Sequence, residues 1–350
     1  MTRDEVLKAV ATGEFLREVD LSGLDLSGAD LSGGTFEDVN LRGANLENAN
    51  LRESVIVKTD FTGADLSGAT FQLAQTNESV FEKAMMHRTN LGATQFANSN
   101  FATVDMLNLE CEQAQFAQCN FDGARVRETQ VVAAAFVGCT TEGLDLTGSA
   151  IERTAMIGAN FANAILDGVR FDRAMMLESN FVGISLSGRT IVTSTFMGCD
   201  MTGVDLSGAD LTQCNFKGAR LVGAEFDGAS ATSALFIEAQ LQDASLRKAN
   251  LQSSLFIDAD VSRADFSDAN LKQTIFTNAV CAGAIFGGVS LYEADMSHAD
   301  LTMCNFTGAN LYRTRLHCVK EDRTIFGPAR ALTLGTDEPR AEAENFEPQY

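Results

Sequence analysis

An apolar residue at every fifth position is the feature that most constrains how this chain folds. The pattern is clearest in residues 21–33, LSGLDLSGADLSG, and its register holds without a slip from Leu16 to Leu316. Two positions before most of these apolar centres lies a small residue, usually alanine. A period of five matches neither the 3.6 residues of a helical turn nor the two-residue alternation of an ordinary strand. The chain therefore needs another backbone geometry.

Four pentapeptides can form the four sides of a square coil. The centre and the small residue then point inward, and the other three positions point to solvent. Stacked coils pair their backbones at the strand spacing of about 4.8 Å, and the repeat is long enough for about 15 coils. We therefore predict an all-β fold, a parallel β-helix or solenoid over residues 14–318, in which each coil contacts only its neighbours.

The segment before the repeat, residues 1–13, is predicted to be a short capping helix. Thr2 and Glu5 have the spacing of a capping box, and Gly13 suits the end of a helix. A helix at this place would cover the edge that the first coil otherwise exposes.

The segment after the repeat, residues 319–350, holds all three prolines of the chain. We interpret residues 319–335 as a folded-back cap and residues 336–350 as a flexible acidic tail.

Three residues break the inward pattern. Thr76 and Thr141 replace apolar centres, and Arg189 stands where a small residue belongs. A buried hydroxyl needs a hydrogen-bond partner, and a cation inside a narrow core is costly. Arg189 is therefore expected to lean out at a corner of its coil.

The sequence contains no recognisable catalytic set. His87, His298 and His317 all fall at outward positions, without a nucleophile and carboxylate that the coil would bring close. We therefore expect a protein that is not an enzyme, with no cofactor and no small-molecule substrate.

Seven of the eight cysteines occupy inward positions and are predicted to be free core residues, with Cys318 as the exception. The adjacent His317 and Cys318 are too few for a zinc site. Reduced thiols, the lack of a signal peptide and the lack of an 18-residue apolar run predict a cytoplasmic protein without a membrane segment.

The net charge is −21, from 47 acidic and 26 basic residues. Direct binding to nucleic acid is disfavoured, because it requires clustered Lys and Arg. The acidity either keeps the protein soluble or forms a surface that imitates DNA. In the second case the acidic face would consist of residues that precede a centre on one side of the coil: Asp25, Asp65, Asp105, Asp145, Asp205 and Asp265.

Another side of the coil, with centres such as Phe136 and Phe256, has apolar residues at outward positions. An exposed apolar strip of this extent usually marks an interface. We predict that it binds a partner protein or a second copy of the chain, unless the C-terminal tail covers it or its composition has simply drifted. The predicted contact residues are Val137, Ile157, Met175, Leu177, Met197, Leu235, Ile237, Leu255, Ile257 and Ile275.

Segments such as Ala29-Asp30-Leu31-Ser32-Gly33 and Ala209-Asp210-Leu211-Thr212 resemble the pentapeptide repeat proteins, over about residues 14–318. The resemblance implies a right-handed quadrilateral β-helix. The best-studied branch of that family resembles DNA in shape and charge, binds DNA gyrase and dimerises through a C-terminal helix. This chain lacks a convincing amphipathic helix at its C-terminus and has no insertion between Leu16 and Leu316.

The opening of the chain is also similar to pentapeptide segments in accessory proteins of bacterial type VI secretion systems. The sequence therefore predicts two alternative functions. The first is a non-catalytic scaffold or adaptor, with a type VI secretion accessory protein as its narrower form. The alternative is a DNA mimic that binds or protects gyrase or another topoisomerase.

Overall fold

The computed structural model describes residues 1–344 and 346, and the chain forms two compact units, Met1–Asn180 and Phe181–Tyr350. Both units are built from parallel backbone pairings between residues 20 positions apart. This register confirms the predicted all-β solenoid of four-sided coils.

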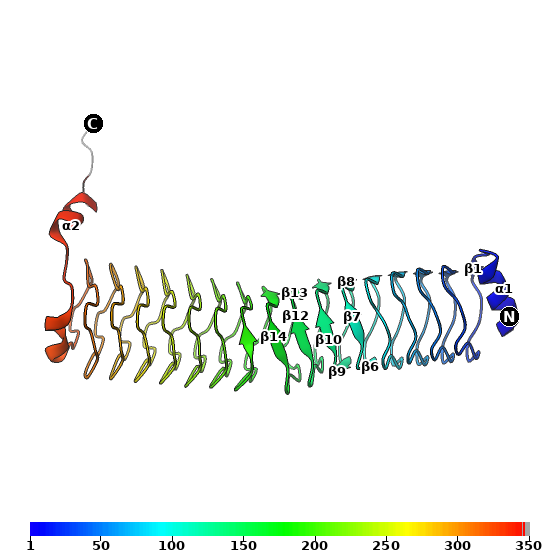
Figure 1. The fold of residues 1–350 in the computed structure, drawn as a ribbon, viewed down its shortest axis with the longest axis horizontal. Helices are drawn as coiled ribbons and strands as arrows, with labels where there is room; N and C mark the ends of the chain where they lie inside the picture. The colour runs from blue at the N-terminus through cyan, green and yellow to red at the C-terminus, as the bar shows by residue number, and fades with distance from the viewer. Residues whose placement is uncertain (345, 347–350) are drawn as a thin grey trace. The chain divides into compact units, whose positions relative to one another are not determined.

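Helix α1 (Arg3–Ala11) confirms the predicted N-terminal helix. The Thr2 amide donates to Glu5 Oε2 at 2.7 Å, and the Glu5 amide donates to Thr2 Oγ1 at 3.4 Å, so the capping box is formed. Val6 and Ala9 are buried. The Arg3 guanidinium donates to the carbonyl oxygens of Asp25 and Ser27, which ties α1 to the first coil beside it (Figure 1).

One side of the first unit carries a parallel sheet of nine strands in which each strand pairs with the one 20 residues later. Its strands are, in order, β1 (Leu16–Arg17), β2 (Thr35–Glu37), β3 (Val55–Val57), β4 (Gln75–Asn77), β5 (Gln95–Ala97), β8 (Gln115–Ala117), β11 (Ala135–Val137), β13 (Ala155–Ile157) and β15 (Met175–Leu177). Shorter ladders occupy two other sides.

The first of these ladders contains β7 (Glu110–Glu112), β10 (Gln130–Val132), β12 (Ala150–Glu152) and β14 (Arg170–Asp172). The other pairs β6 (Asp105–Leu107) with β9 (Arg125–Arg127).

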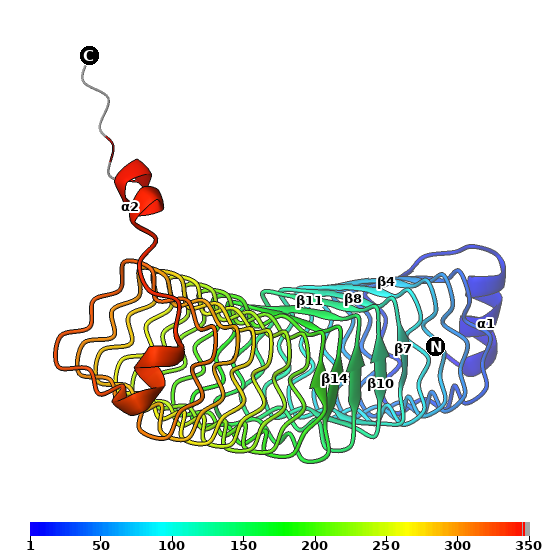
Figure 2. The same ribbon diagram turned by 60° about the vertical axis from the view of Figure 1, so that its left-hand side comes forward.

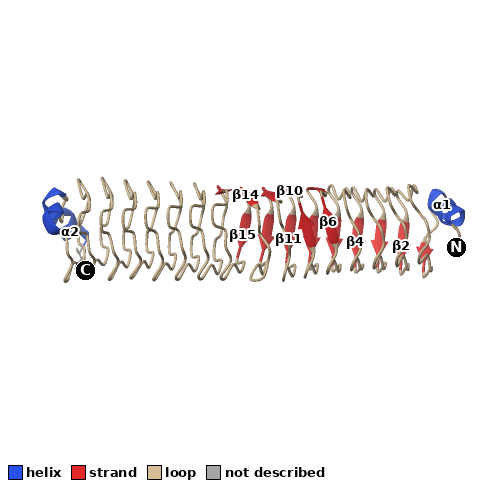
Figure 3. Cartoon of the chain, turned by 90° about the horizontal axis from the view of Figure 1, so that it is seen from below, coloured by secondary structure: helices blue, strands red, loops and turns tan. Residues whose placement is uncertain are grey.

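In the second unit the same register is carried mainly by single bridges, after β16 (Ile191–Val192). Thr195, Asn215, Leu235, Leu255, Ile275, Asp295 and Arg315 form one such series. Figure 3 shows this contrast, with strands in the first unit and mostly loop in the second. The longest ladder thus has nine strands, fewer than the predicted coil number of about 15, because the later coils lack regular strands.

The core consists of the centres and the small residues before them, as predicted. Leu26 and Leu31 are fully buried and Ala29 is 1% exposed. Phenylalanine rings stack between neighbouring coils: Phe96 on Phe116 at 5.1 Å in the first unit, and Phe236 on Phe256 at 4.7 Å in the second. These spacings are close to the distance between paired strands, so the rings form ladders along each core.

The corners of the coil require left-handed backbone. The residue two positions after a centre has positive φ, for example 66° at Gly23 and 57° at Asn48. Glycine adopts this conformation without steric cost, which explains its frequency at these outward positions.

The polar inward residues behave differently from one another. Thr141 Oγ1 donates to the Asn160 carbonyl oxygen and accepts from the Asn160 amide, both at 2.9 Å. Thr76 is buried, and its Oγ1 has no hydrogen-bond partner within the part of the chain that the structure describes. Arg189 is partly exposed.

The cysteines are free, and all except Cys318 are buried. Burial raises the pKa of the Cys111 and Cys214 thiols to about 12, which keeps them protonated.

The C-terminal segment continues the stacking and then leaves it. Phe326 stacks on Phe306 at 5.1 Å, and the 3-10 helix η1 (Gly327–Leu332) follows. Leu334 then pairs with the last coil, donating to the Thr314 carbonyl and accepting from the Leu316 amide. Helix α2 (Glu338–Glu344) comes next (Figure 2).

Helix α2 lies in the stretch that we expected to be a flexible acidic tail, so Glu338–Glu344 of that stretch are helical. Position 345 and positions 347–350 of the expected tail lie outside the described residues.

Candidate interaction face

We call the side of the coil with centres such as Phe96 and Phe236 the candidate face. Residues directly before and after each centre point outward, because side chains alternate along an extended segment. The ten residues predicted to form the apolar strip all lie at these outward positions. Each unit carries its own part of the face.

In the first unit, strands β11, β13 and β15 bring Val137, Ile157, Met175 and Leu177 onto the candidate face. Val137 and Met175 are each 44% exposed, whereas Ile157 and Leu177 are half-buried. Neighbouring coils shield these side chains, because their positions are separated only by the strand spacing of about 4.8 Å.

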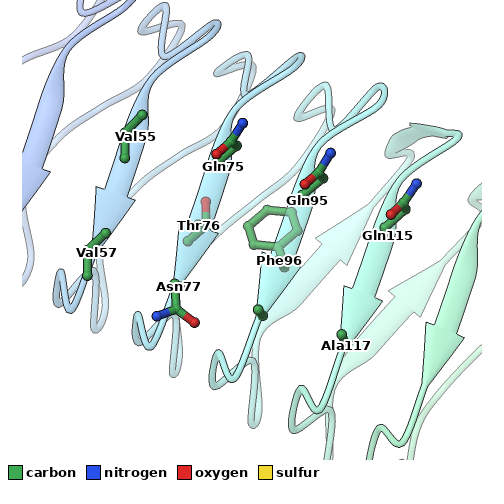
Figure 4. Close-up of a pocket in the computed structure, with 10 residues that line it drawn as sticks. Val55, Val57, Gln75, Thr76, Asn77, Gln95, Phe96, Gln115 and Ala117 are labelled. Carbon is green, nitrogen blue, oxygen red and sulfur yellow. The ribbon is translucent and has the colours of Figure 1, made fainter.

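Strands β3, β4, β5 and β8 form a shallow groove of about 340 Å³ on the candidate face of the first unit. On successive strands, Val55, Gln75, Gln95 and Gln115 line one side of the groove (Figure 4). Val57, Asn77, Ala97 and Ala117 line the other side, with Thr76 and Phe96 between the rows. Sequence reasoning missed this groove, although Thr76 in place of a centre and glutamine at 20-residue intervals both mark it.

In the second unit, Met197 is 42% exposed, and Leu235, Ile237, Leu255, Ile257 and Ile275 are half-buried. Leu235 and Leu255 are paired across neighbouring coils, as are Leu255 and Ile275. Asn215 and Lys217 interrupt the apolar residues, and the Lys217 ammonium lies 3.3 Å from a Glu238 carboxylate oxygen. Most of the predicted strip is therefore a compact apolar surface with limited exposure.

The predicted acidic face has a structural role that the sequence reasoning missed. An aspartate carboxylate before the centre accepts a hydrogen bond from the amide two residues later, as Asp25 does from Ser27 at 3.0 Å and Asp205 from Ser207 at 2.9 Å. Such Asx turns close the corner of the coil. The same bond is made by Asp65, Asp145 and Asp265.

Asp105 differs from the other aspartates of this face, because Arg127 lies 3.0 Å from its carboxylate and His87 lies 3.5 Å from it. Burial raises the pKa of the Asp105 carboxyl, but the bonds and charges of Arg127 and His87 together outweigh burial and leave this pKa below its usual value. In the first unit, Met85, Arg125 and Ile165 also interrupt this row of acidic residues.

One of the three histidines is covered by the C-terminal segment. His317 follows the centre Leu316 and so keeps its outward register position, but it is 1% exposed rather than open to solvent, because the chain after Leu334 folds over it. Its ring, the ring of His298 and the carboxylate of Glu344 converge, with their ligand atoms within 4.8 Å of one another. The contact between positions 317 and 344 depends on α2, which the repeat pattern could not reveal.

None of the described helices is long and apolar enough to cross a membrane.

A protein-family model matches the sequence. The profile described as pentapeptide repeats matches the chain in eight copies, over residues 8–38, 35–72, 156–188, 199–236, 234–273 and 274–316. These segments together span more than half of the chain. No curated protein matches the sequence.

Several solved structures are similar to the chain. A trypsin-treated form of QnrB1, a plasmid-mediated fluoroquinolone resistance protein, is 14% identical, with 57% of this chain and 89% of that chain covered and a TM-score of 0.39. HetL, a pentapeptide repeat protein involved in heterocyst differentiation regulation from Nostoc sp. strain PCC 7120, is 19% identical, with coverages of 90% and 97% and a TM-score of 0.21.

Proposed function

The chain belongs to the pentapeptide repeat family, and we propose that it acts as a non-catalytic scaffold in the cytoplasm that binds another protein through the candidate face. The observation that carries this proposal is the group formed by Leu235, Ile237, Leu255 and Ile257. These four side chains flank the buried centres Phe236 and Phe256 on neighbouring coils. Contiguous apolar side chains at outward positions are typical of protein interfaces.

The first unit supports the same proposal with different residues. Val137 and Met175 offer exposed apolar side chains, and the groove between β3 and β8 offers concave surface on the same face. The open glutamine amides beside the groove can donate to and accept from a partner's backbone. A partner that binds here would therefore make apolar and polar contacts together.

The proposal is tested by replacing Leu235, Ile237, Leu255 and Ile257 with serine in the full chain. The centres stay in place, so far-UV circular dichroism should be unchanged. We expect affinity for the partner, or for a second copy, to fall by about tenfold or more, because apolar contacts at the middle of an interface dominate its binding energy. Affinity capture measures partner binding, and light scattering measures self-association.

In a matched control, serine replaces Val280 and Ile285 instead. These two residues are each 41% exposed and lie on other sides of the coil in the second unit. This control should bind as the unchanged protein does. Equal capture and equal assembly by the four-serine variant and the control would contradict the proposal.

The narrower form of the proposal is an adaptor role in a type VI secretion system. It is supported by the similarity of residues 21–33 to segments of such accessory proteins. The tagged protein should capture structural components of that apparatus from cells in which it is assembled. If other partners are recovered without any such component, the adaptor role in type VI secretion is contradicted, whereas the general scaffold role is not.

The second candidate is a DNA mimic that binds a topoisomerase, and the net charge of −21 favours it. The use of the aspartates of the predicted acidic face in Asx turns and the interruptions of their row speak for a structural role instead. A gyrase supercoiling assay distinguishes the two candidate functions. If micromolar protein causes no inhibition of gyrase and no protection of it, mimicry of DNA is excluded.

A further inference from the structure

Three potential metal ligands, His298, His317 and Glu344, converge where α2 approaches the last coils of the second unit, and a thiol lies beside one of them. His298 Nε2 lies 3.2 Å from Glu344 Oε2, and His317 Nε2 lies 3.1 Å from the same oxygen. The Cys318 thiol sulfur lies 3.6 Å from His317 Nε2. We propose that His298, His317, Cys318 and Glu344 bind one divalent transition-metal ion of the zinc class, which fastens α2 to the coil.

The residues that converge are scarce in this chain. It contains three histidines, and two of them meet here with their rings perpendicular and their centroids 5.2 Å apart. Cys318 is the one cysteine of the eight that is not buried. The repeat itself explains neither histidine, because outward positions accept almost any polar residue.

The donor set selects the metal by its chemistry. Two imidazole nitrogens, a thiolate and a carboxylate suit Zn²⁺, whereas Mg²⁺ and Ca²⁺ prefer oxygen ligands alone. Zinc binds these atoms at about 2.0–2.3 Å, so tetrahedral ligand atoms lie about 3.2–3.8 Å apart. The contacts of Glu344 Oε2 with the two histidines, at 3.1 and 3.2 Å, are close to this range. The Cys318 sulfur is 3.6 Å from His317 Nε2 and has to move toward the other two ligands to complete the set.

The surroundings allow an ion to enter and hold the ligands in place. The His317 side chain is 1% exposed, whereas that of Glu344 is 36% exposed, so the site opens to solvent on the α2 side. Arg340 Nε donates to Glu344 Oε1 at 2.7 Å, which orients the carboxylate and leaves Oε2 toward the histidines. Supporting contacts of this kind orient metal ligands.

Metal binding must change the protons of the site. The Asp337 amide donates to His317 Nδ1 at 3.1 Å, which places the proton of the neutral ring on Nε2. A metal ion at Nε2 takes the place of that proton, which moves to Nδ1, and Cys318 releases its thiol proton to solvent. The Asp337 amide then faces an N–H group and has to turn away. Binding is thereby coupled to the position of the segment just before α2.

The site is tested on the full chain after its metal has been removed by dialysis against a chelator. Zn²⁺ is titrated in competition with a chromophoric chelator, with excess Mg²⁺ present to occupy surface carboxylates. We expect one high-affinity Zn²⁺ per chain and a loss of affinity of about tenfold or more for His298→Ala and for Glu344→Gln. These residues are partly exposed, so both variants should fold.

His87→Ala is the matched control, because His87 also lies beside a carboxylate, at 3.5 Å from Asp105, but belongs to the first unit. Its zinc affinity should equal that of the unchanged protein. Absence of a high-affinity Zn²⁺, or equal affinity for His298→Ala, Glu344→Gln and the control, overturns the site.

Two spectroscopic readouts test the ligand set and the proton shift. With Co²⁺ in place of Zn²⁺, the thiolate charge-transfer band should disappear in Cys318→Ser, and a band that persists overturns the assignment of Cys318. The amide resonance of Asp337 should shift when Zn²⁺ binds. An unmoved resonance in the loaded protein overturns the predicted proton transfer. The inference is independent of the scaffold proposal, because none of these measurements involves a partner.

Discussion

In the first unit, three-residue strands carry most of the candidate face, whereas in the second unit the same positions are joined by single bridges. The cores beneath differ as well. The centres under the first part run from Phe36 through Ile56 and Thr76, whose hydroxyl has no hydrogen-bond partner among the described residues, to Phe96. Under the second part, the rings from Phe196 to Phe276 stack without a break, 4.6–5.4 Å apart.

In this contrast the outward surface differs where the buried centres differ. The groove of the first unit lies over the coil in which Thr76 interrupts the aromatic ladder. The closely packed apolar group of the second unit lies over unbroken rings. A solenoid can thus change its surface locally, because each coil packs only against its two neighbours.

The largest effect is expected from copying the interruption into the second unit. Phe236→Thr removes a ring that stacks on Phe216 at 5.1 Å and on Phe256 at 4.7 Å. Truncation of a buried phenylalanine costs about 3–5 kcal/mol, because packing is lost and a cavity is left. Urea denaturation measures the change, and a loss of under about 1 kcal/mol would mean that the ladder contributes little to stability.

The reverse change in the first unit should have a smaller effect of opposite sign. Thr76→Val keeps the shape of the side chain and removes a buried hydroxyl that has no partner among the described residues. We expect the free energy of unfolding to rise by about 1 kcal/mol. Thr141→Val is the matched control and should lower it by about 1–3 kcal/mol, because the Asn160 amide and carbonyl lose their partner. Equal effects of the two variants would contradict this account of Thr76.

The smallest effect concerns the aspartates at the corners of both units. The Ser27 amide lowers the pKa of the Asp25 carboxyl. At Asp205 burial raises the pKa of the carboxyl, but the hydrogen bonds from Ser207 and Ser185 together lower it by more. A carboxyl whose pKa is lower in the folded state stabilises the protein above the unfolded value of 3.8, and this contribution is lost as the pH falls below it.

The acid-induced fall in melting temperature should therefore be smaller in Asp25→Asn and Asp205→Asn, since asparagine keeps the turn without titrating. Melting curves at about pH 6 and about pH 3 measure it. If the melting temperature of these variants falls as much as that of the unchanged protein, the two aspartates do not contribute to the loss of stability in acid.

The fold could be predicted from the sequence because burial sets its period. Every centre must face inward, so the burial of Leu26 and Leu31 can be predicted from the local sequence alone. The Asx turns were also written in the sequence, as an aspartate two residues before a serine at Asp25 and Ser27. They were missed because these aspartates were read only as surface charge.

The candidate sites were less predictable for two physical reasons. Register gives the direction of a side chain and not its exposure, which explains why Ile257 points outward yet is half-buried. His317 depends on a contact with Glu344 that spans 27 residues and lies outside the repeat. No periodic rule applies to such a contact, since α2 does not share the five-residue pattern.

The pairing of residues 20 positions apart also determines how each unit would respond to mechanical force. The Phe216 amide donates to the Leu235 carbonyl and the Phe236 amide to the Leu255 carbonyl, so each of these hydrogen bonds joins one coil to the next. Tension along the stacking direction would therefore strain one interface between coils at a time. Each coil that detaches would release 20 residues, or about 66–72 Å of extended chain. Under force, each unit would therefore unfold in steps of equal length, one coil at a time.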